Sequence, residues 1–215
     1  PVPPPAPTLQ YSPSYEGVSL AWDAAAETAI DPMIGAPDFQ GYKVYRAQYT
    51  PSEWQMIAAF DNVDRPVDVV TTEGDTLARG VNLPPVQNSF LDNGGEFLGE
   101  PYEKPVNGLP YYYAVVAFDP EKPATAGRPQ LPSIESPRTN FLTDPATGAP
   151  LPVIPRGLYE YTEDGKLNQE WNIEDVTVVP NPYRGTSVLE ERYTEKIMFQ
   201  NLPPACKISI FTFTG

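Results

Sequence analysis

Two short acidic loops carry the residue types in this chain that could hold a metal ion. Asp61 and Asp64 lie in the first loop, and Asp92 and Glu96 bracket an Asn-Gly-Gly turn in the second. Calcium takes about six to eight oxygen ligands, so these four carboxylates are candidate calcium ligands. Neither loop has the spacing of a defined calcium motif, and Asp, Asn and Gly are also the residues that make tight turns. We therefore expect turns here, and no cofactor.

The chain contains few of the residues and motifs that enzymes commonly use for catalysis. The chain has no histidine, which removes Ser-His-Asp and Cys-His nucleophiles and histidine-containing zinc sites. No glycine-rich phosphate loop is present. The single cysteine, Cys206, leads into an apolar run and is expected to be a small buried residue. With 28 acidic residues, carboxylate pairs arise by chance and none stands out. We expect that the protein is not an enzyme.

Four aromatic residues could stack on a sugar ring: Tyr49, Trp54, Tyr102 and Tyr112. Packing between neighbouring strands explains the same residues equally well. Binding of a glycan, as an accessory carbohydrate-binding module of a secreted hydrolase, therefore stays the alternative function.

Charge and composition restrict the partners. The net charge is −14, from 14 basic and 28 acidic residues. Such a surface repels nucleic acid and anionic lipid headgroups, so neither is an expected partner. No apolar run reaches about 18 residues, so membrane insertion is not expected. The first residue is Pro1, and no initiator methionine or signal peptide is visible, which indicates a mature or excised piece of a longer protein.

The elements that must position these residues are strands. Proline accounts for 28 of 215 residues, about 13%, whereas a usual protein has ~5%. The prolines are spaced too closely for long helices. The most informative run is 110–119, which is aromatic and β-branched. Alternate residues of a strand share a face, and this run is apolar on both faces, which predicts a strand that is covered on both sides. The face assigned to the core comprises Tyr111, Tyr113, Val115 and Ala117.

Further short strands are predicted along the chain, and turn signals separate them. The second strand should point Trp22 inward, and the third should do the same with Tyr42 and Val44. The predicted strands are 9–11, 18–22, 41–46, 54–60, 67–72, 89–92 and 131–136. The predicted fold class is therefore all-β. The resemblance described next implies that its main part is an Ig-like β-sandwich.

Residues 8–137 resemble a fibronectin type III domain. The matching residues are Leu20-Ala21-Trp22, Tyr42-Lys43-Val44 and the Tyr-x-Tyr-x-Val-x-Ala pattern from Tyr111 to Ala117. The resemblance implies that Tyr111 is the tyrosine-corner residue, whose hydroxyl bonds to nearby backbone. Residues 1–7 would be a proline-rich tether before this domain. The excess over the usual ~100 residues would lie in loops 24–40 and 61–87.

Residues 173–215 resemble the beginning of the C-terminal Ig-like module of exported Bacteroidetes-type proteins, many of which are cargo of the type IX secretion system. The resemblance rests on four segments, 176–183, 197–199, 201–203 and 208–215, which include a Pro-Asn-Pro-Tyr turn and an alternating Ile/Phe strand. A linker would span 138–172, with a small hairpin at Asp164-Gly165. The exposed apolar residues of the last strand are expected to make interactions: Ile208, Ile210, Phe211 and Phe213.

The family module has more strands than this chain supplies. The missing strands would be cleaved or disordered, or another chain would provide them; alternatively, the strands of 173–215 add to the first domain. These features together predict a secreted or cell-surface structural or adhesive segment of a larger bacterial protein. Its partners would be proteins, either other copies or the remainder of its parent, and copies could assemble into a filament by strand complementation. The sequence does not specify the ligand, the metal content or the oligomeric state.

Overall fold

The computed structural model describes residues 2–71, 74–122, 132–155, 157–158, 166–167, 169–179, 198–203 and 206–211. The chain divides into two units, Pro1–Pro155 and Arg156–Gly215. The described residues contain strands and two single 3₁₀ turns, η1 (Ala25–Thr28) and η2 (Ile173–Asp175), but no α-helix. Within these residues, no helix has the length and apolar character needed to cross a bilayer. The predicted all-β fold class is confirmed.

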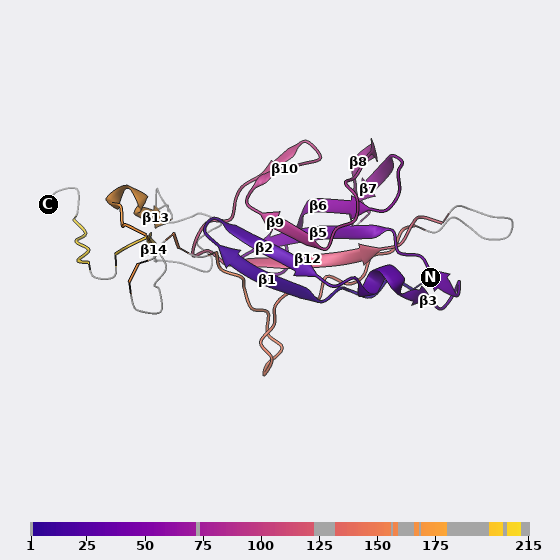
Figure 1. The fold of residues 1–215 in the computed structure, drawn as a ribbon, viewed down its shortest axis with the longest axis horizontal. Coiled ribbons are helices and arrows are strands. Elements are labelled where there is room, and N and C mark those ends of the chain that lie inside the picture. Colours follow the sequence, from indigo (N-terminus) through magenta and orange to yellow (C-terminus); the bar gives the residue numbers. More distant parts are fainter. Residues whose placement is uncertain are drawn as a thin grey trace. The chain divides into compact units, whose positions relative to one another are not determined.

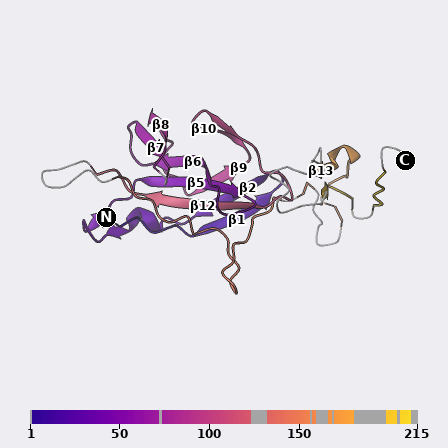
Figure 2. The same cartoon turned by 180° about the vertical axis from the view of Figure 1, so that it is seen from behind.

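Two three-stranded antiparallel sheets form the body of the first unit (Figures 1 and 2). One sheet has the order β1 (Leu9–Ser14), β2 (Gly17–Trp22) and β9 (Ser89–Asp92). The other has the order β12 (Tyr111–Phe118), β5 (Gly41–Gln48) and β6 (Gln55–Asp61). The two sheets pack face to face through aromatic side chains, and the result is a β-sandwich.

Strand register decides which side chains enter the sandwich. Tyr113 lies opposite Arg46, Val115 opposite Val44, and Ala117 opposite Tyr42, so these side chains share the inner face. The Trp22 ring of β2 meets the Tyr42 ring edge-on, with centroids 5.6 Å apart. All seven residues assigned to the core from the sequence are buried: Trp22, Tyr42, Val44, Tyr111, Tyr113, Val115 and Ala117.

A further layer covers the opposite face of the β12–β5–β6 sheet. It contains two hairpins, one of β7 (Val67–Val70) and β8 (Thr76–Val81), the other of β10 (Gly95–Phe97) and β11 (Glu100–Tyr102). Both figures show these hairpins on the same side of β5 and β6. Their apolar residues pack on the outer side chains of the sheet, and the cluster is Tyr45, Met56, Ala59, Val69 and Val116 with Trp54, Val81, Leu83, Phe97 and Leu98. The 61–87 loop, expected to hold excess residues, contributes the β7–β8 hairpin to this layer. The layer explains why all eight residues of β12 are buried.

Gly41 begins β5 where no side chain would fit. A Cβ atom at this position would lie 2.0 Å from the Phe60 carbonyl oxygen and 2.8 Å from the Phe118 ring. Only glycine lets the two neighbouring strands approach this closely.

The strand predicted at 131–136 is wrong as a continuous element. Leu131 is outside the described residues, and residues 132–136 form a single bridge, between Phe118 and Glu135. Two backbone bonds hold them to β12: Asp119 N–H donates to Ile134 O at 3.1 Å, and Ser136 N–H donates to Ala117 O at 2.8 Å. Pro132 and Pro137 lack N–H donors, which limits how far a ladder can extend.

Residues 138–155, expected to be part of a linker, belong to the first unit. The Asn140 side chain takes the place of a strand beside β12: its Nδ2 donates to Val115 O at 2.8 Å, and its Oδ1 accepts from Val115 N–H at 3.3 Å. Val153 then pairs with Tyr111 through two backbone bonds. Between these contacts, a hairpin bridged at Thr143 and Pro150 projects from the sheet, as the salmon loop in Figure 1 shows.

The second unit contains one described strand pair, β13 (Thr177–Val179) with β14 (Met198–Gln200). Asn201 organises it: its Nδ2 donates to Asp175 O, and its carbonyl oxygen accepts from Trp171 Nε1, both at 2.9 Å.

The alternating Ile/Phe strand near the C-terminus, expected over 207–213, is not formed over its described part, 207–211. None of the described strands pairs with it. Ile208, Ile210 and Phe211 are exposed there, as is Cys206, which was expected to be buried. Phe213, the hairpin at Asp164-Gly165 and the Pro-Asn-Pro-Tyr turn lie outside the described residues.

Candidate functional site

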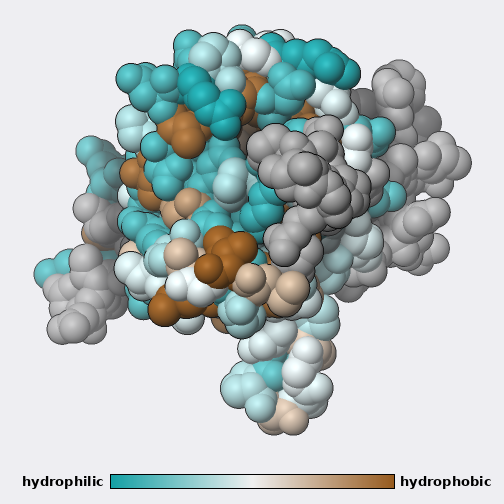
Figure 3. Space-filling view, turned by 90° about the vertical axis from the view of Figure 1, so that its right-hand side faces the viewer, coloured by the Kyte–Doolittle hydropathy of each residue, from teal (hydrophilic) through white to brown (hydrophobic). Residues whose placement is uncertain are grey.

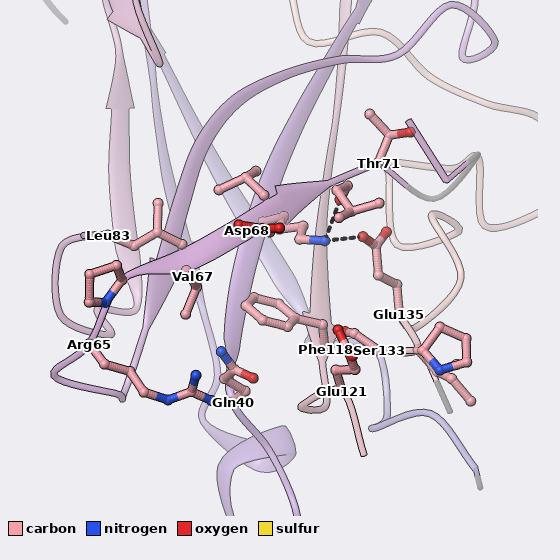
Figure 4. A pocket seen from close by; sticks show the side chains of 16 residues that line it. Gln40, Arg65, Val67, Asp68, Thr71, Leu83, Phe118, Glu121, Ser133 and Glu135 are labelled. Carbon is pink, nitrogen blue, oxygen red and sulfur yellow. Dashed lines mark hydrogen bonds and ion pairs between the residues drawn. The ribbon is translucent and has the colours of Figure 1, made fainter. Parts of the chain in front are cut away.

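A cavity of about 700 Å³ opens on the outer face of the β12–β5–β6 sheet, between β7 and residues 132–135 (Figure 4). Apolar side chains line its inner part, among them Val67, Leu83 and Phe118. Polar residues from distant parts of the chain complete it, including Gln40 and Arg65. Its volume is in the range of small-molecule sites, about 300–1,000 Å³.

Lys43 is the central polar residue of the cavity wall that the sheet forms. Strand alternation directs it to the outer face of β5, where it is buried. Its Nζ forms an ion pair with Glu135, donates to Val70 O at 2.7 Å and lies 4.8 Å from the Phe118 ring centroid. The Tyr45 hydroxyl donates to the same Glu135 carboxylate at 3.3 Å. The ion pair thus joins β5 to the segment beside β12, and it leaves no free charge at the inner wall of the cavity.

The mouth of the cavity carries the exposed Arg65 on one side and Glu121 on the other (Figure 4). Ser133, which also lines the cavity, donates its hydroxyl to Asp119 O at 2.5 Å. The lining contains neither histidine nor cysteine. Its volume is sufficient for a small ligand.

Asp92, a candidate calcium ligand from the sequence, forms a buried ion pair inside the sandwich instead. The side chain is fully buried, and its Oδ2 accepts from Arg46 Nη1 at 3.0 Å and from the Tyr113 hydroxyl at 2.8 Å. Arg46 also donates to Glu103 O at 2.8 Å. Burial, with the nearby Asp92 charge, raises the pKa of Tyr113 far above its ordinary value, so this phenol stays protonated as a donor.

The other candidate calcium ligands are not brought together. Asp61 is 2% exposed at the end of β6, where its Oδ1 accepts from Val63 N–H at 3.3 Å. Burial raises the pKa of this carboxyl above its ordinary value. Asp64 is exposed in the loop after β6, and Glu96 is exposed in the middle of β10. Across the described parts of the chain, no group of three or more His, Cys, Asp or Glu side chains could hold a metal ion.

The aromatic residues considered for sugar stacking do not form an exposed platform. Trp54 is half-buried, with its ring centroid 6.1 Å from that of Phe141. Tyr102 lies 5.4 Å from the Arg46 guanidinium. Tyr112 is buried within β12, and Tyr49 is half-buried. These positions account for the aromatic residues by packing.

Tyr111 has the contacts of a tyrosine corner. Its hydroxyl accepts from Val106 N–H at 2.9 Å, five residues earlier in the chain, and from Gln48 Nε2 at 3.1 Å. The loop before β12 is thereby fixed to the start of the strand. Burial raises the pKa of Tyr111, so its hydroxyl stays protonated.

A second ionic cluster, which the sequence reasoning missed, surrounds Lys122 just beyond β12. Its Nζ lies 2.9 Å from Asp38 Oδ2, 3.0 Å from Asp119 Oδ2 and 3.7 Å from Asp31 Oδ2. Hydrogen bonds to Asp38 and Asp119 raise the pKa of Lys122 above its ordinary value. Asp119 lies three residues before Lys122, but nothing in the sequence links Asp31 and Asp38 to it.

The sequence did contain a signal that Lys43 and Arg46 form buried ion pairs. Both are cations within a strand whose other residues are apolar, and a buried charge needs a partner. That signal predicts two ion pairs but does not name the acidic partners.

No protein-family model matches the chain, and neither the curated proteins nor the solved structures that were searched contain a match.

Proposed function

We propose that this chain is a structural or adhesive β-sandwich segment of a larger exported bacterial protein, and that it has no enzymatic role. The observation that carries this proposal is the use of the buried charges. Lys43 and Arg46 each join β5 to a segment distant in sequence, through Glu135 and Asp92. Charges that are paired in this way stabilise a module.

The location at the cell surface or outside the cell rests on the resemblance of residues 173–215 to the C-terminal modules of type IX secretion cargo. The resemblance of residues 8–137 to fibronectin type III domains supports a spacing or adhesive role. The acidic surface, with a net charge of −14, suits a soluble module that does not bind nucleic acid.

Assembly by strand complementation is part of this proposal. The exposed apolar side chains of Ile208, Ile210 and Phe211 support it, because an extended apolar segment gains backbone partners when it adds as a strand to a sheet of another copy. The test is sedimentation velocity of the full chain at several concentrations. Oligomers that grow with concentration, and that are lost on Ile210→Ser with Phe211→Ser, are expected. A single monomeric species at all concentrations would refute assembly.

The alternative is an accessory carbohydrate-binding module, which the outer cavity favours through its volume and the polar residues at its mouth. A glycan array tests it directly. Binding that is lost on Arg65→Ala, at the cavity mouth, would support this alternative. An array without signal would leave the structural role as the conclusion.

A further inference from the structure

A short hairpin of the first unit presents large apolar side chains to solvent. It consists of β3 (Ile30–Asp31), β4 (Ala36–Pro37) and the turn between them. Ile30 is 65% exposed, Met33 71% and Ile34 50%. Isolated apolar residues on a surface are ordinary, whereas three within five positions of one turn form a patch of the kind that marks an interaction site.

The hairpin is held in one conformation by its own backbone. Gly35 N–H donates to Asp31 O at 2.8 Å, and Gly35 has φ +70°, a left-handed conformation that favours glycine. The Asp31 side chain accepts from Met33 N–H at 2.7 Å, which fixes the turn before the tip. The apolar tip is therefore presented on an ordered turn.

Ion pairs anchor the base of the hairpin to the end of β12. Asp31 is the last residue of β3, and Asp38 directly follows β4. Both lie close to Lys122, which also contacts Asp119. Because the base of the hairpin is fixed, ordering the tip when a partner binds costs little conformational entropy.

The surroundings of the tip are acidic. Residues 23–40 contain four carboxylates and no lysine or arginine. Asp31 and Asp38 are nearly buried beside Lys122, whereas Asp23 is exposed and Glu27 is half-buried. Lys122, the cation at the base, is already engaged by three aspartates. Figure 3 faces the end of Figure 1 that carries β3 and shows brown hydrophobic surface beside teal hydrophilic surface. Any surface that covers the tip must accept apolar side chains and tolerate this negative charge.

The geometry points to the β3–β4 hairpin as a docking site for a protein partner with an apolar groove rimmed by lysine or arginine. Electrostatic complementarity selects this occupant. A second copy of this chain would bring the same negative charge, and an anionic membrane would repel the hairpin. This inference goes beyond the proposed function, and its test is independent of the sedimentation and glycan experiments.

The probe is a library of random 12-residue peptides displayed on phage and selected on the immobilised full chain. A variant with Ile30→Ser, Met33→Ser and Ile34→Ser serves as the counter-target. Selected peptides should combine apolar residues with lysine or arginine. The variant should bind them about tenfold more weakly or worse, because it lacks the anchor side chains. Their affinity should fall as salt is raised, because rim charges are screened.

Leu77→Ser and Leu91→Ser are the matched controls, since both leucines are 48% exposed elsewhere in the first unit. These two variants should bind the selected peptides like the wild type. Thermal unfolding shows whether each variant is folded. If the triple variant is not folded, the single variant Met33→Ser replaces it. Peptides that bind wild type and variant equally, an acidic consensus or no selected peptide would each overturn the inference. So would concentration-dependent self-association, or binding to phosphatidylserine vesicles, that is lost in the triple variant.

Discussion

The buried pair of Arg46 and Asp92 allows the sharpest test of how the sandwich is held. Replacing Asp92 with alanine leaves the Arg46 guanidinium with Glu103 O as its remaining hydrogen-bond acceptor and removes the acceptor of the Tyr113 hydroxyl. Removing one partner of a buried ion pair costs about 3–5 kcal/mol, because the other charge stays buried. A domain of this kind has about 5–15 kcal/mol in total, so Asp92→Ala should remove a large share of its stability.

Removing both charges should cost far less. Arg46→Met combined with Asp92→Leu replaces the pair by apolar side chains, a change that is often nearly neutral when the volume is kept. The Tyr113 hydroxyl would still lack its acceptor, at about 1–3 kcal/mol, and adding Tyr113→Phe should recover most of that. The order of stability expected is wild type and triple variant highest, then the double variant, then Asp92→Ala.

Urea unfolding of the full chain, followed by tryptophan fluorescence, measures this order through the midpoint and the slope. Asp92→Asn is a useful fourth variant, because it keeps an acceptor for Tyr113 while it removes the charge. If Asp92→Ala stays within about 1 kcal/mol of wild type, or if the double variant is no more stable than Asp92→Ala, the reasoning about the pair is refuted.

Three further substitutions test other parts of the first unit. Tyr111→Phe removes the acceptor of two hydrogen bonds and should cost about 1–3 kcal/mol in urea unfolding, whereas Tyr112→Phe, the control, should change little; equal effects would contradict the tyrosine corner. Asp61→Asn should leave the free energy of unfolding unchanged at pH values below 3.8, the ordinary pKa of aspartate, and should increase it at higher pH. The reason is that burial raises the pKa of Asp61, so its ionised form disfavours the folded state. Parallel profiles of stability against pH for wild type and variant would count against this. Asn140→Ala should cost about 2–4 kcal/mol and speed amide exchange at Val115, whose backbone bonds it removes; unchanged exchange at that amide would show that the bonds are unimportant.

The body of the sandwich was predictable because its strands are long enough to show alternation. The run at 110–119 and the inward positions Trp22, Tyr42 and Val44 correspond to β12, β2 and β5. Apolar residues on both faces of β12 predicted a covering layer, and the structure contains one. Period-two patterns of six to eight residues give this information directly.

The covering hairpins were less predictable for the opposite reason. β10 and β11 have three residues each, and Pro101 lies within β11, so no alternation is visible. At 131–136 the prediction was wrong in the opposite sense. An apolar pattern suggested a strand, but prolines lack the backbone N–H groups that a β-ladder needs. Similarly, residues 207–211 have a strand-like pattern, yet strand formation also requires a neighbour, which a local pattern does not reveal.

The two cations of β5 connect these observations. Lys43 and Arg46 are three positions apart, an odd spacing, so their side chains emerge on opposite faces of the strand. Lys43 meets Glu135 on the outer face, and Arg46 meets Asp92 between the sheets. A one-residue slip of β5 would exchange these faces and leave both charges buried without partners. The pairs therefore specify the register of β5 from both sides, which apolar residues on both faces could not do by themselves.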